Sequence, residues 1–232
     1  MQIARQFFTL CLALIFAPSA YAGNLAYECS TPILEVKFPV LYGHYNGTVT
    51  GGNLFLSSDI PNPPTVIWQK ANIKKLYTLM MVDLDGNAYG SYPDAVAPGK
   101  NSPVRHWIVG NIPGDVLRSR GYDETSSKAG NGKIDIVMPY RTPFIPMVSD
   151  RYGLYLFEQN KAISFVPLHS AITNFDYADF IEKYKLGKPK ASNYFVAVHV
   201  SQSPFSGKPF HGNDVSKNWH KDFGKGKLAP CN

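Results

Sequence analysis

Short apolar runs separated by turn residues dominate the pattern of the chain. Such runs occupy residues 33–40, 65–68, 76–82, 133–138, 152–159 and 194–200, and another begins at Val104. Their length and their Gly-, Pro- and Asn-rich borders are typical of β-strands. Residues 174–185 instead repeat apolar side chains at a spacing near 3.6, which predicts a helix capped by Thr173 or Asn174 and stopped at Gly187. Residues 115–132 are polar and predict an exposed loop.

The run at 76–82 and the run that begins at Val104 frame the candidate chemistry. The first run is followed by Asp83 and Asp85, and the second carries His106 near its start. If these strands pair, the acids and the imidazole share one pocket mouth. A carboxylate beside the imidazole would raise the pKa of His106 and favour its cation. The alternative is that both acids are turn residues and His106 is a satisfied strand histidine.

A third strand adds polar groups to this candidate pocket. Asp150 and Arg151 stand immediately before the strongly apolar run that begins with Tyr152. The Tyr152 hydroxyl can donate a hydrogen bond to a ligand. Taken alone, the residues predict a small polar pocket formed where three strands begin or end.

The first 22 residues have the pattern of a secretory signal peptide. Arg5 gives a basic start, residues 7–17 are apolar and uncharged, and Ala20 and Ala22 fit a small-x-small cleavage site. An uncleaved anchor is the alternative. We expect a secreted protein, extracellular or periplasmic, whose residues 23–232 form a single domain, because no repeat or long linker divides them.

Removal of the signal peptide leaves two cysteines, Cys29 and Cys231. In an exported protein an even pair predicts a disulfide, although two free thiols are the alternative. Closing such a long loop stabilises by roughly 4 to 5 kcal/mol at most in the chain-entropy model. Asn46 begins an Asn-Gly-Thr glycosylation acceptor, which matters only in a eukaryotic host.

Composition favours a mainly β globular domain and gives no enzyme signature. Aromatic residues make up 13% of the 232 residues, and 19 Gly and 18 Pro predict many turns. The net charge is +6, or +5 once Arg5 is removed, with a basic segment at 217–227 that touches phosphates or a membrane surface, or is simply solvated. Known nucleophile, phosphate-loop and zinc motifs are missing from the sequence, so we expect no enzyme, cofactor, metal or nucleic-acid partner.

Several motifs in fixed order resemble one family. They are NPPTVIWQ, LYTLMMVDLD, SPVRHWIVGNIPG and PYRTPFIPMVSDRYGLYLFEQ, followed by a helix with YKLGKP and a Tyr-Phe-Val strand. Over roughly residues 60–200 the chain is similar to the phosphatidylethanolamine-binding protein family, also called the Raf kinase inhibitor or flowering-locus-T-like family. This resemblance implies a large antiparallel sheet packed with a smaller sheet, a few peripheral helices, and a pocket for phosphate or a phospholipid head group.

The resemblance also implies which residues line the pocket. Asp83 and Asp85 match the two acids of the family's Asp-Pro-Asp motif, and His106 matches the histidine of its His-Trp strand. Tyr140 and Pro143 match the start of the family's Tyr-x-Gly-Pro loop. Arg151 and Tyr152 match the Arg-Tyr of its His-Arg-Tyr motif.

Departures from the family pattern change the expected ligand. Leu84 replaces the proline between the two acids, and Asp150 stands where the family has its second pocket histidine. An Asp-to-phosphate contact at about 4 Å and an effective dielectric of about 20 would cost roughly 4 kcal/mol. The resemblance implies a small anionic or zwitterionic ligand, but this cost favours a cation or the amine of a zwitterion, unless Asp150 pairs with His106 or Arg151 and closes the pocket.

Surface loops give the chain a second candidate function, the binding of a protein partner. Some members of the family inhibit proteases or kinases through surface loops, so the resemblance also implies a possible protein partner. The long loops at 86–103 and 115–132 are the candidates for that contact. Membrane contact is expected to be peripheral at most.

Overall fold

The computed structural model describes residues 33–39, 47–84, 104–125, 134–143, 149–168 and 175–198. The strands and helices in these ranges are β1 (Glu35–Lys37), β2 (Leu54–Leu56), the 3-10 helix η1 (Ser57–Asp59), β3 (Thr65–Ile67), β4 (Leu76–Asp83), β5 (Val104–Pro113), α1 (Gly114–Ser119), β6 (Asp135–Met138), β7 (Ser149–Gln159), α2 (Tyr177–Lys183) and β8 (Ala191–Val198). Within the described ranges, no helix has the length and apolar character needed to cross a membrane. The predicted signal peptide, Cys29 and Cys231 lie outside these ranges.

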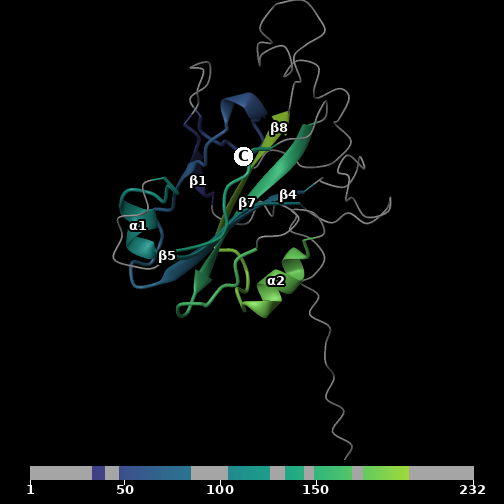
Figure 1. Cartoon of the computed structure of the whole chain (residues 1–232). Coiled ribbons are helices and arrows are strands. Elements are labelled where there is room, and N and C mark those ends of the chain that lie inside the picture. Colours follow the sequence, from purple (N-terminus) through teal and green to yellow (C-terminus); the bar gives the residue numbers. More distant parts are fainter. Residues whose placement is uncertain are drawn as a thin grey trace, which may run out of the picture.

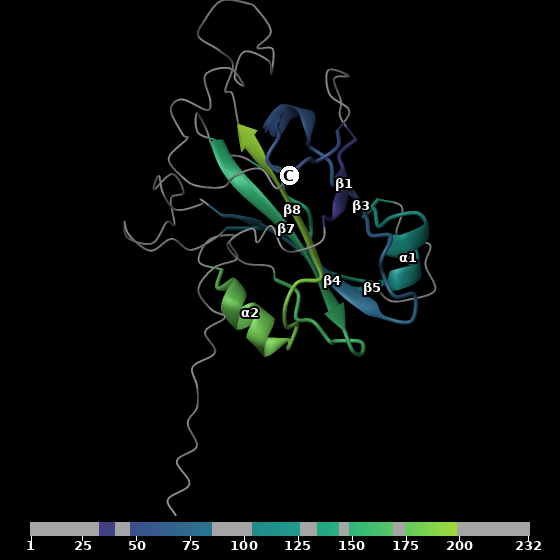
Figure 2. The same cartoon turned by 180° about the vertical axis from the view of Figure 1, so that it is seen from behind.

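Two sheets form the frame of the domain. Six strands make a large sheet in the order β2-β8-β7-β4-β5-β6, and β1 pairs with β3 in a separate two-stranded sheet. All pairings are antiparallel except that of β2 with β8, which is parallel. The two views in Figure 1 and Figure 2 show the small sheet and α1 to one side of the large sheet and α2 to the other. The predicted mainly β fold with a large and a smaller sheet is confirmed.

The central strand β4 is buried along nearly its whole length. It lies between β5 and β7, and both of its faces are covered. A strand covered on both faces needs apolar residues at consecutive positions, which explains the unbroken run in LYTLMMV. Because successive side chains point to opposite faces, Tyr77, Leu79 and Met81 belong to one core, while Met80 and Val82 belong to another.

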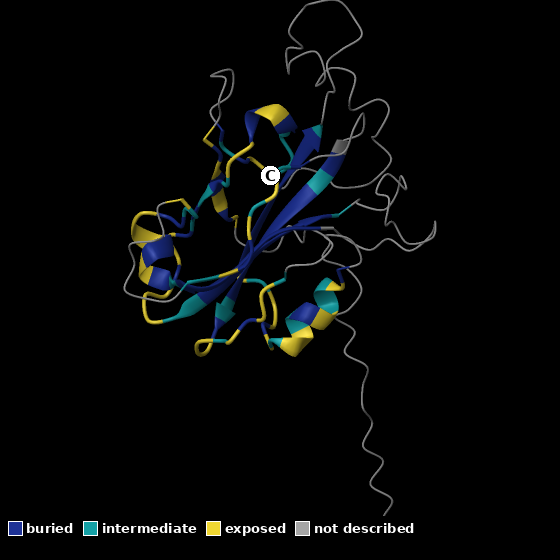
Figure 3. Ribbon diagram, viewed as in Figure 1, coloured by how far each residue is buried: buried dark blue, intermediate teal, exposed yellow. Residues whose placement is uncertain are grey.

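The two faces of the large sheet support two separate cores. The first face packs against the small sheet and α1, with Val36, Val66 and Leu117 as contributors. The second face packs against α2 and the chain around it, including Phe165 and Phe180. Figure 3 shows that both helices turn buried residues towards the sheet and exposed residues away from it.

Both helices differ from the sequence-based expectation. The prediction of a loop at 115–132 is wrong at its start, because α1 forms there. Val116 and Leu117 of α1 are buried, so tertiary packing stabilises a helix that the composition of this stretch does not indicate. The second helix is shorter than predicted. Asp176 caps it by accepting from the backbone N–H groups of Ala178 and Asp179, and the left-handed Lys185 (φ 52°) follows its end.

Candidate functional site

Strand pairing places the predicted acid, imidazole and tyrosine at one end of the large sheet. Asp83, the last residue of β4, lies opposite Val104 on β5 and opposite Tyr152 on β7. Met81 and Asp83 are two residues apart on β4, so Asp83 points to the first face as Met81 does. Asp150 and Tyr152 are likewise two residues apart on β7, so Asp150 also points to the first face. Asp83, Asp150 and Tyr152 are each at most 1% exposed.

A β-bulge turns His106 towards this group. Trp107 lies opposite Met81 and Arg105 opposite Val82, so His106 is the additional residue in β5. A bulge changes where the following side chains point. The His106 ring meets the Tyr152 ring edge-on with centroids 5.0 Å apart, on the first face, while Arg105 lies over the Phe175 ring on the second face.

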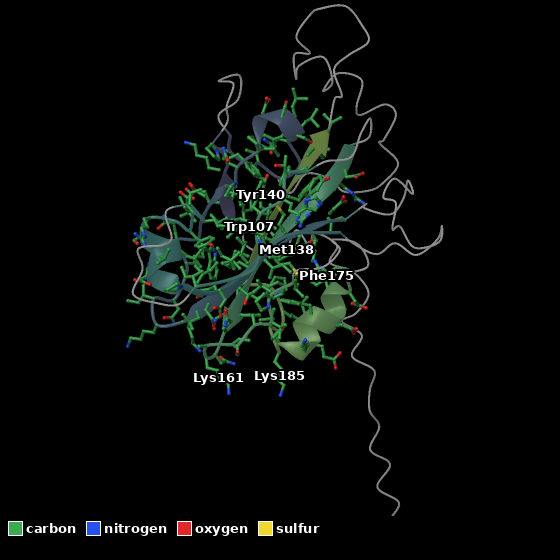
Figure 4. The ribbon with its side chains drawn as sticks, in the orientation of Figure 1. Trp107, Met138, Tyr140, Lys161, Phe175 and Lys185 are labelled. Atoms are coloured by element: carbon green, nitrogen blue, oxygen red, sulfur yellow. The ribbon has the colours of Figure 1, made fainter. Side chains whose placement is uncertain are left out.

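The chain at 140–143 closes over the same end of the first face. The Arg141 backbone N–H donates to the His106 carbonyl over 2.8 Å. The Tyr140 hydroxyl donates to the Ile60 carbonyl (2.8 Å), and the Thr142 hydroxyl donates to the Pro61 carbonyl (3.2 Å). Pro143 is buried. Figure 4 shows Tyr140 and Trp107 towards β1, away from Met138 and Phe175, which belong to the second core.

Burial keeps the His106 ring neutral. Its pKa falls to about 4, mainly through desolvation; the hydrogen bond to the Arg141 carbonyl raises this pKa, and the Arg141 charge lowers it. The expectation of a raised pKa is therefore wrong, because burial outweighs any carboxylate. The bond of 3.1 Å between Nδ1 and the Arg141 carbonyl assigns the proton to Nδ1.

The other ring nitrogen of His106 is a buried acceptor. With the proton on Nδ1, Nε2 carries a lone pair, and among the described residues it has no hydrogen-bond partner. The site thus combines this acceptor with the side chains of Asp83 and Asp150. Such a group of acceptors suits a ligand that brings hydrogen-bond donors or positive charge.

Arg141 is a site residue that the motif comparison missed. It is exposed, and its charge is close enough to lower the pKa of both His106 and Arg105. In the sequence it stands between Tyr140 and Thr142, at the unspecified position of the family's Tyr-x-Gly-Pro pattern. The only sequence signal was the positive charge itself, and Arg141 reaches the site through its backbone hydrogen bond to His106.

Glu124 connects two parts of the site through hydrogen bonds. Its carboxylate accepts from the Trp107 indole N–H (2.5 Å) and from the Tyr140 backbone N–H (3.4 Å). Burial raises the pKa of Glu124, whereas these two hydrogen bonds lower it. Glu124 therefore fixes β5 and the 140–143 segment relative to each other. Nothing in the sequence marked it, because it stands in the polar stretch read as loop.

Of the predicted ligand-binding residues, six are brought to this end of the sheet: Asp83, His106, Tyr140, Pro143, Asp150 and Tyr152. Asp85 lies outside the described residues, as do loop 86–103, Asn46 and the basic segment at 217–227. Within the described ranges no group of three or more His, Cys, Asp or Glu side chains could hold a metal ion.

Comparison with known proteins gives one family. A family model described as phosphatidylethanolamine-binding protein matches residues 42–195. A 26 kDa secreted antigen of Toxocara canis is 30% identical over 156 residues, covering 65% of this chain and 52% of the antigen. The chain therefore matches about half the length of that relative.

Two further matches extend the comparison. The protein TWIN SISTER of FT of Arabidopsis thaliana is 29% identical over 163 residues, covering 69% of this chain and 78% of that protein. A crystal structure of carboxypeptidase Y inhibitor complexed with its cognate proteinase has a TM-score of 0.52 at 16% identity. It covers 73% of this chain and 84% of the matched chain, and it is evidence for the fold alone.

Proposed function

Because the chain belongs to the phosphatidylethanolamine-binding protein family, we propose that it is an exported ligand-binding protein whose site takes a zwitterionic head group of the phosphoethanolamine type. The proposed site residues are Asp83, Asp85, His106, Tyr140, Arg141, Pro143, Asp150 and Tyr152. Export is supported by the signal-peptide pattern and by the similarity to a secreted antigen. Binding without catalysis is part of the proposal.

The observation that carries the proposal is the neutral, buried His106 at the same end of the same sheet face as Asp83 and Asp150. Nε2 of His106 can only accept a hydrogen bond, and Asp83 and Asp150 occupy the same end of the same face. An ammonium group supplies three donors and a positive charge to such acceptors. A bare phosphate group would bring only acceptors and negative charge to the same place.

Arg141 gives the proposed ligand its second point of contact. Its guanidinium is exposed and acts electrostatically on His106. Arginine binds phosphate oxygens through paired N–H groups. A ligand that carries an ammonium at one end and a phosphate at the other therefore matches the acids on one side and Arg141 on the other.

Calorimetric titration of the oxidised protein without its first 22 residues tests this proposal. Phosphoethanolamine, ethanolamine and inorganic phosphate are compared, and vesicles with and without phosphatidylethanolamine distinguish a lipid from the free head group. Asp150→Asn should weaken phosphoethanolamine binding by roughly 10- to 100-fold, since a charged hydrogen bond is removed from a buried site. Arg141→Gln should weaken it only about two- to fivefold, since Arg141 is exposed.

Two further variants serve as controls, one for the position of the removed charge and one for the type of side chain at position 150. Glu182→Gln removes an exposed carboxylate from α2, on the second face, and should leave binding unchanged. Asp150→His restores an imidazole and should shift preference towards inorganic phosphate. Tighter binding of phosphate than of phosphoethanolamine by the unmodified protein would contradict the proposal.

Inhibition of a proteinase is the second candidate function. It is supported by the similarity of this fold to carboxypeptidase Y inhibitor, whose structure is described in complex with its cognate proteinase. A panel of serine carboxypeptidases and endopeptidases tests it. Inhibition that survives Asp150→Asn, without binding of any of the small ligands, would favour this function over the first.

A further inference from the structure

A second cleft lies at the other end of the large sheet. It has a volume of about 540 Å³ and is lined by Leu76, Asn111, Asp135 and residues 162–165. This volume is within the range of small-molecule sites. Leu76 and Asp83 are the first and last residues of β4, so the cleft is separated from the first site by about 23 Å, at about 3.3 Å for each strand residue.

Asn111 makes one wall of the cleft rigid. It is 6% exposed and has a left-handed backbone with φ of 58°, a conformation that Asn adopts more readily than most residues. Its Nδ2 group donates to Asp135 Oδ2 (2.7 Å) and to the Ile163 carbonyl (2.8 Å). Its Oδ1 accepts from the Ile163 N–H (3.0 Å) and from Gln159 Nε2 (2.8 Å).

These bonds tie the opposite wall to the sheet. The Asn111 amide pairs with both backbone groups of Ile163, much as a neighbouring strand would. At the far end of the segment, the Leu168 N–H donates to the Val137 carbonyl and the Val166 N–H to the Tyr184 hydroxyl. The cleft is therefore formed before any ligand arrives, which lowers the entropic cost of binding.

Phe165 forms the apolar floor and is held from both sides. Its ring lies so close to Gly110 that a Cβ atom there would overlap it. On its other side the ring meets Tyr184 (centroids 4.7 Å apart) and Phe180 (6.2 Å). The ring therefore gives the cleft a fixed apolar surface, and the partly exposed acid Asp135 shares the same lining.

Asp135 sets the charge of the cleft. It is the one charged residue among the described residues of the lining, and it shares that lining with the apolar Leu76, Ile163 and Phe165. We propose that the cleft binds a small primary amine with an apolar body, its ammonium against Asp135 and its hydrocarbon against Phe165 and Ile163. This site is independent of the head-group site proposed above.

The single acid among the described lining residues suits a ligand with a single positive charge. Lys75 and Lys161 each adjoin a lining residue; Lys75 Nζ donates to Asn160 Oδ1 (3.2 Å), and Figure 4 shows Lys161 extending away from the fold at this end. A second ammonium on the ligand would find no second carboxylate among these described lining residues. A monoamine should therefore bind more tightly than a diamine of similar length.

Titration with phenethylamine, followed by protein NMR, tests the proposal. Saturable shifts are expected at residues 162–165 and at Asn111, with affinity weakened roughly tenfold by Asp135→Asn. That substitution keeps an oxygen for the Asn111 N–H and removes only the charge. 1,5-Diaminopentane and 3-phenylpropionate serve as ligands of wrong charge, and both should bind at least several-fold more weakly.

Two further variants keep the result interpretable. Ser164→Trp changes an exposed lining residue, so it should block the cleft without unfolding the protein. Asp150→Asn, at the other end of the sheet, should leave the shifts at 162–165 unchanged. Equal affinity for 3-phenylpropionate, shifts unaffected by both Asp135→Asn and Ser164→Trp, or shifts abolished by Asp150→Asn would each overturn the proposal.

Discussion

Acidification should destabilise the fold through His106. Its pKa in the folded protein is about 4, against 6.5 for the exposed imidazole. The unfolded chain therefore binds the proton more readily, and the stability due to the neutral ring is present above about pH 6.5 and is lost as the pH falls towards 4. The difference of about 2.5 in pKa, at about 1.4 kcal/mol for each unit, gives about 3 kcal/mol.

Urea denaturation at a series of pH values measures this loss. The comparison is with His106→Asn, whose Nδ2 stands close to the position of Nδ1 and can still donate to the Arg141 carbonyl. Glu124 has a raised pKa and titrates in both proteins, so it drops out of the difference. The wild type should lose about 3 kcal/mol more than the variant between pH 6.5 and pH 4.

An NMR titration of the His106 ring gives an independent value. A midpoint near 6.5 or above would refute the argument that burial dominates. So would a pH dependence of stability that is the same in the wild type and in His106→Asn.

Three further changes test how the site and its surroundings are held. Asn193→Ala removes four hydrogen bonds of a fully buried amide, two donated to the Leu34 and Val49 carbonyls and two accepted from backbone N–H groups. The free energy of unfolding should fall by about 3 kcal/mol, and a loss below about 1 kcal/mol would contradict this. Glu124→Ala leaves the Trp107 indole N–H without its acceptor, so it should lower the free energy of unfolding by about 2 kcal/mol and shift the tryptophan fluorescence. Glu124→Gln should lower it by less than about 1 kcal/mol, and equal losses for the two variants would argue against the positioning role. Gly110→Ala forces Phe165 from its place and should cost about 2 kcal/mol by denaturation, together with loss of phenethylamine binding; unchanged stability would show that the ring can move freely.

The strands were predictable because their apolar runs are short, continuous and bounded by turn residues. β4 is the clearest case, since a strand covered on both faces is mostly apolar, and its two buried polar residues are Thr78, which donates to Gln159, and Asp83 at its end. The placement of Asp83 and His106 at one end of the sheet followed from one assumption, that β4 and β5 pair, and the structure has that pairing.

Other features depend on tertiary contacts that no local pattern expresses. α1 forms because Val116 and Leu117 find a place in the first core, although their surroundings in the sequence are polar. The bulge at His106 and the left-handed Asn111 arise from the register of β5 against its neighbours. The sign of the His106 pKa shift was missed for the same reason, because it depends on burial and not on neighbours in the chain.

The central claim is that the end of the large sheet around His106 takes a zwitterionic head group. NMR mapping of phosphoethanolamine on the labelled protein tests this most directly, because it shows both whether and where the ligand binds. The account predicts saturable shifts at His106, Arg141, Asp150 and Tyr152, with residues 162–165 unaffected. Saturation without shifts at these four residues, or no saturable binding at millimolar ligand, would contradict it.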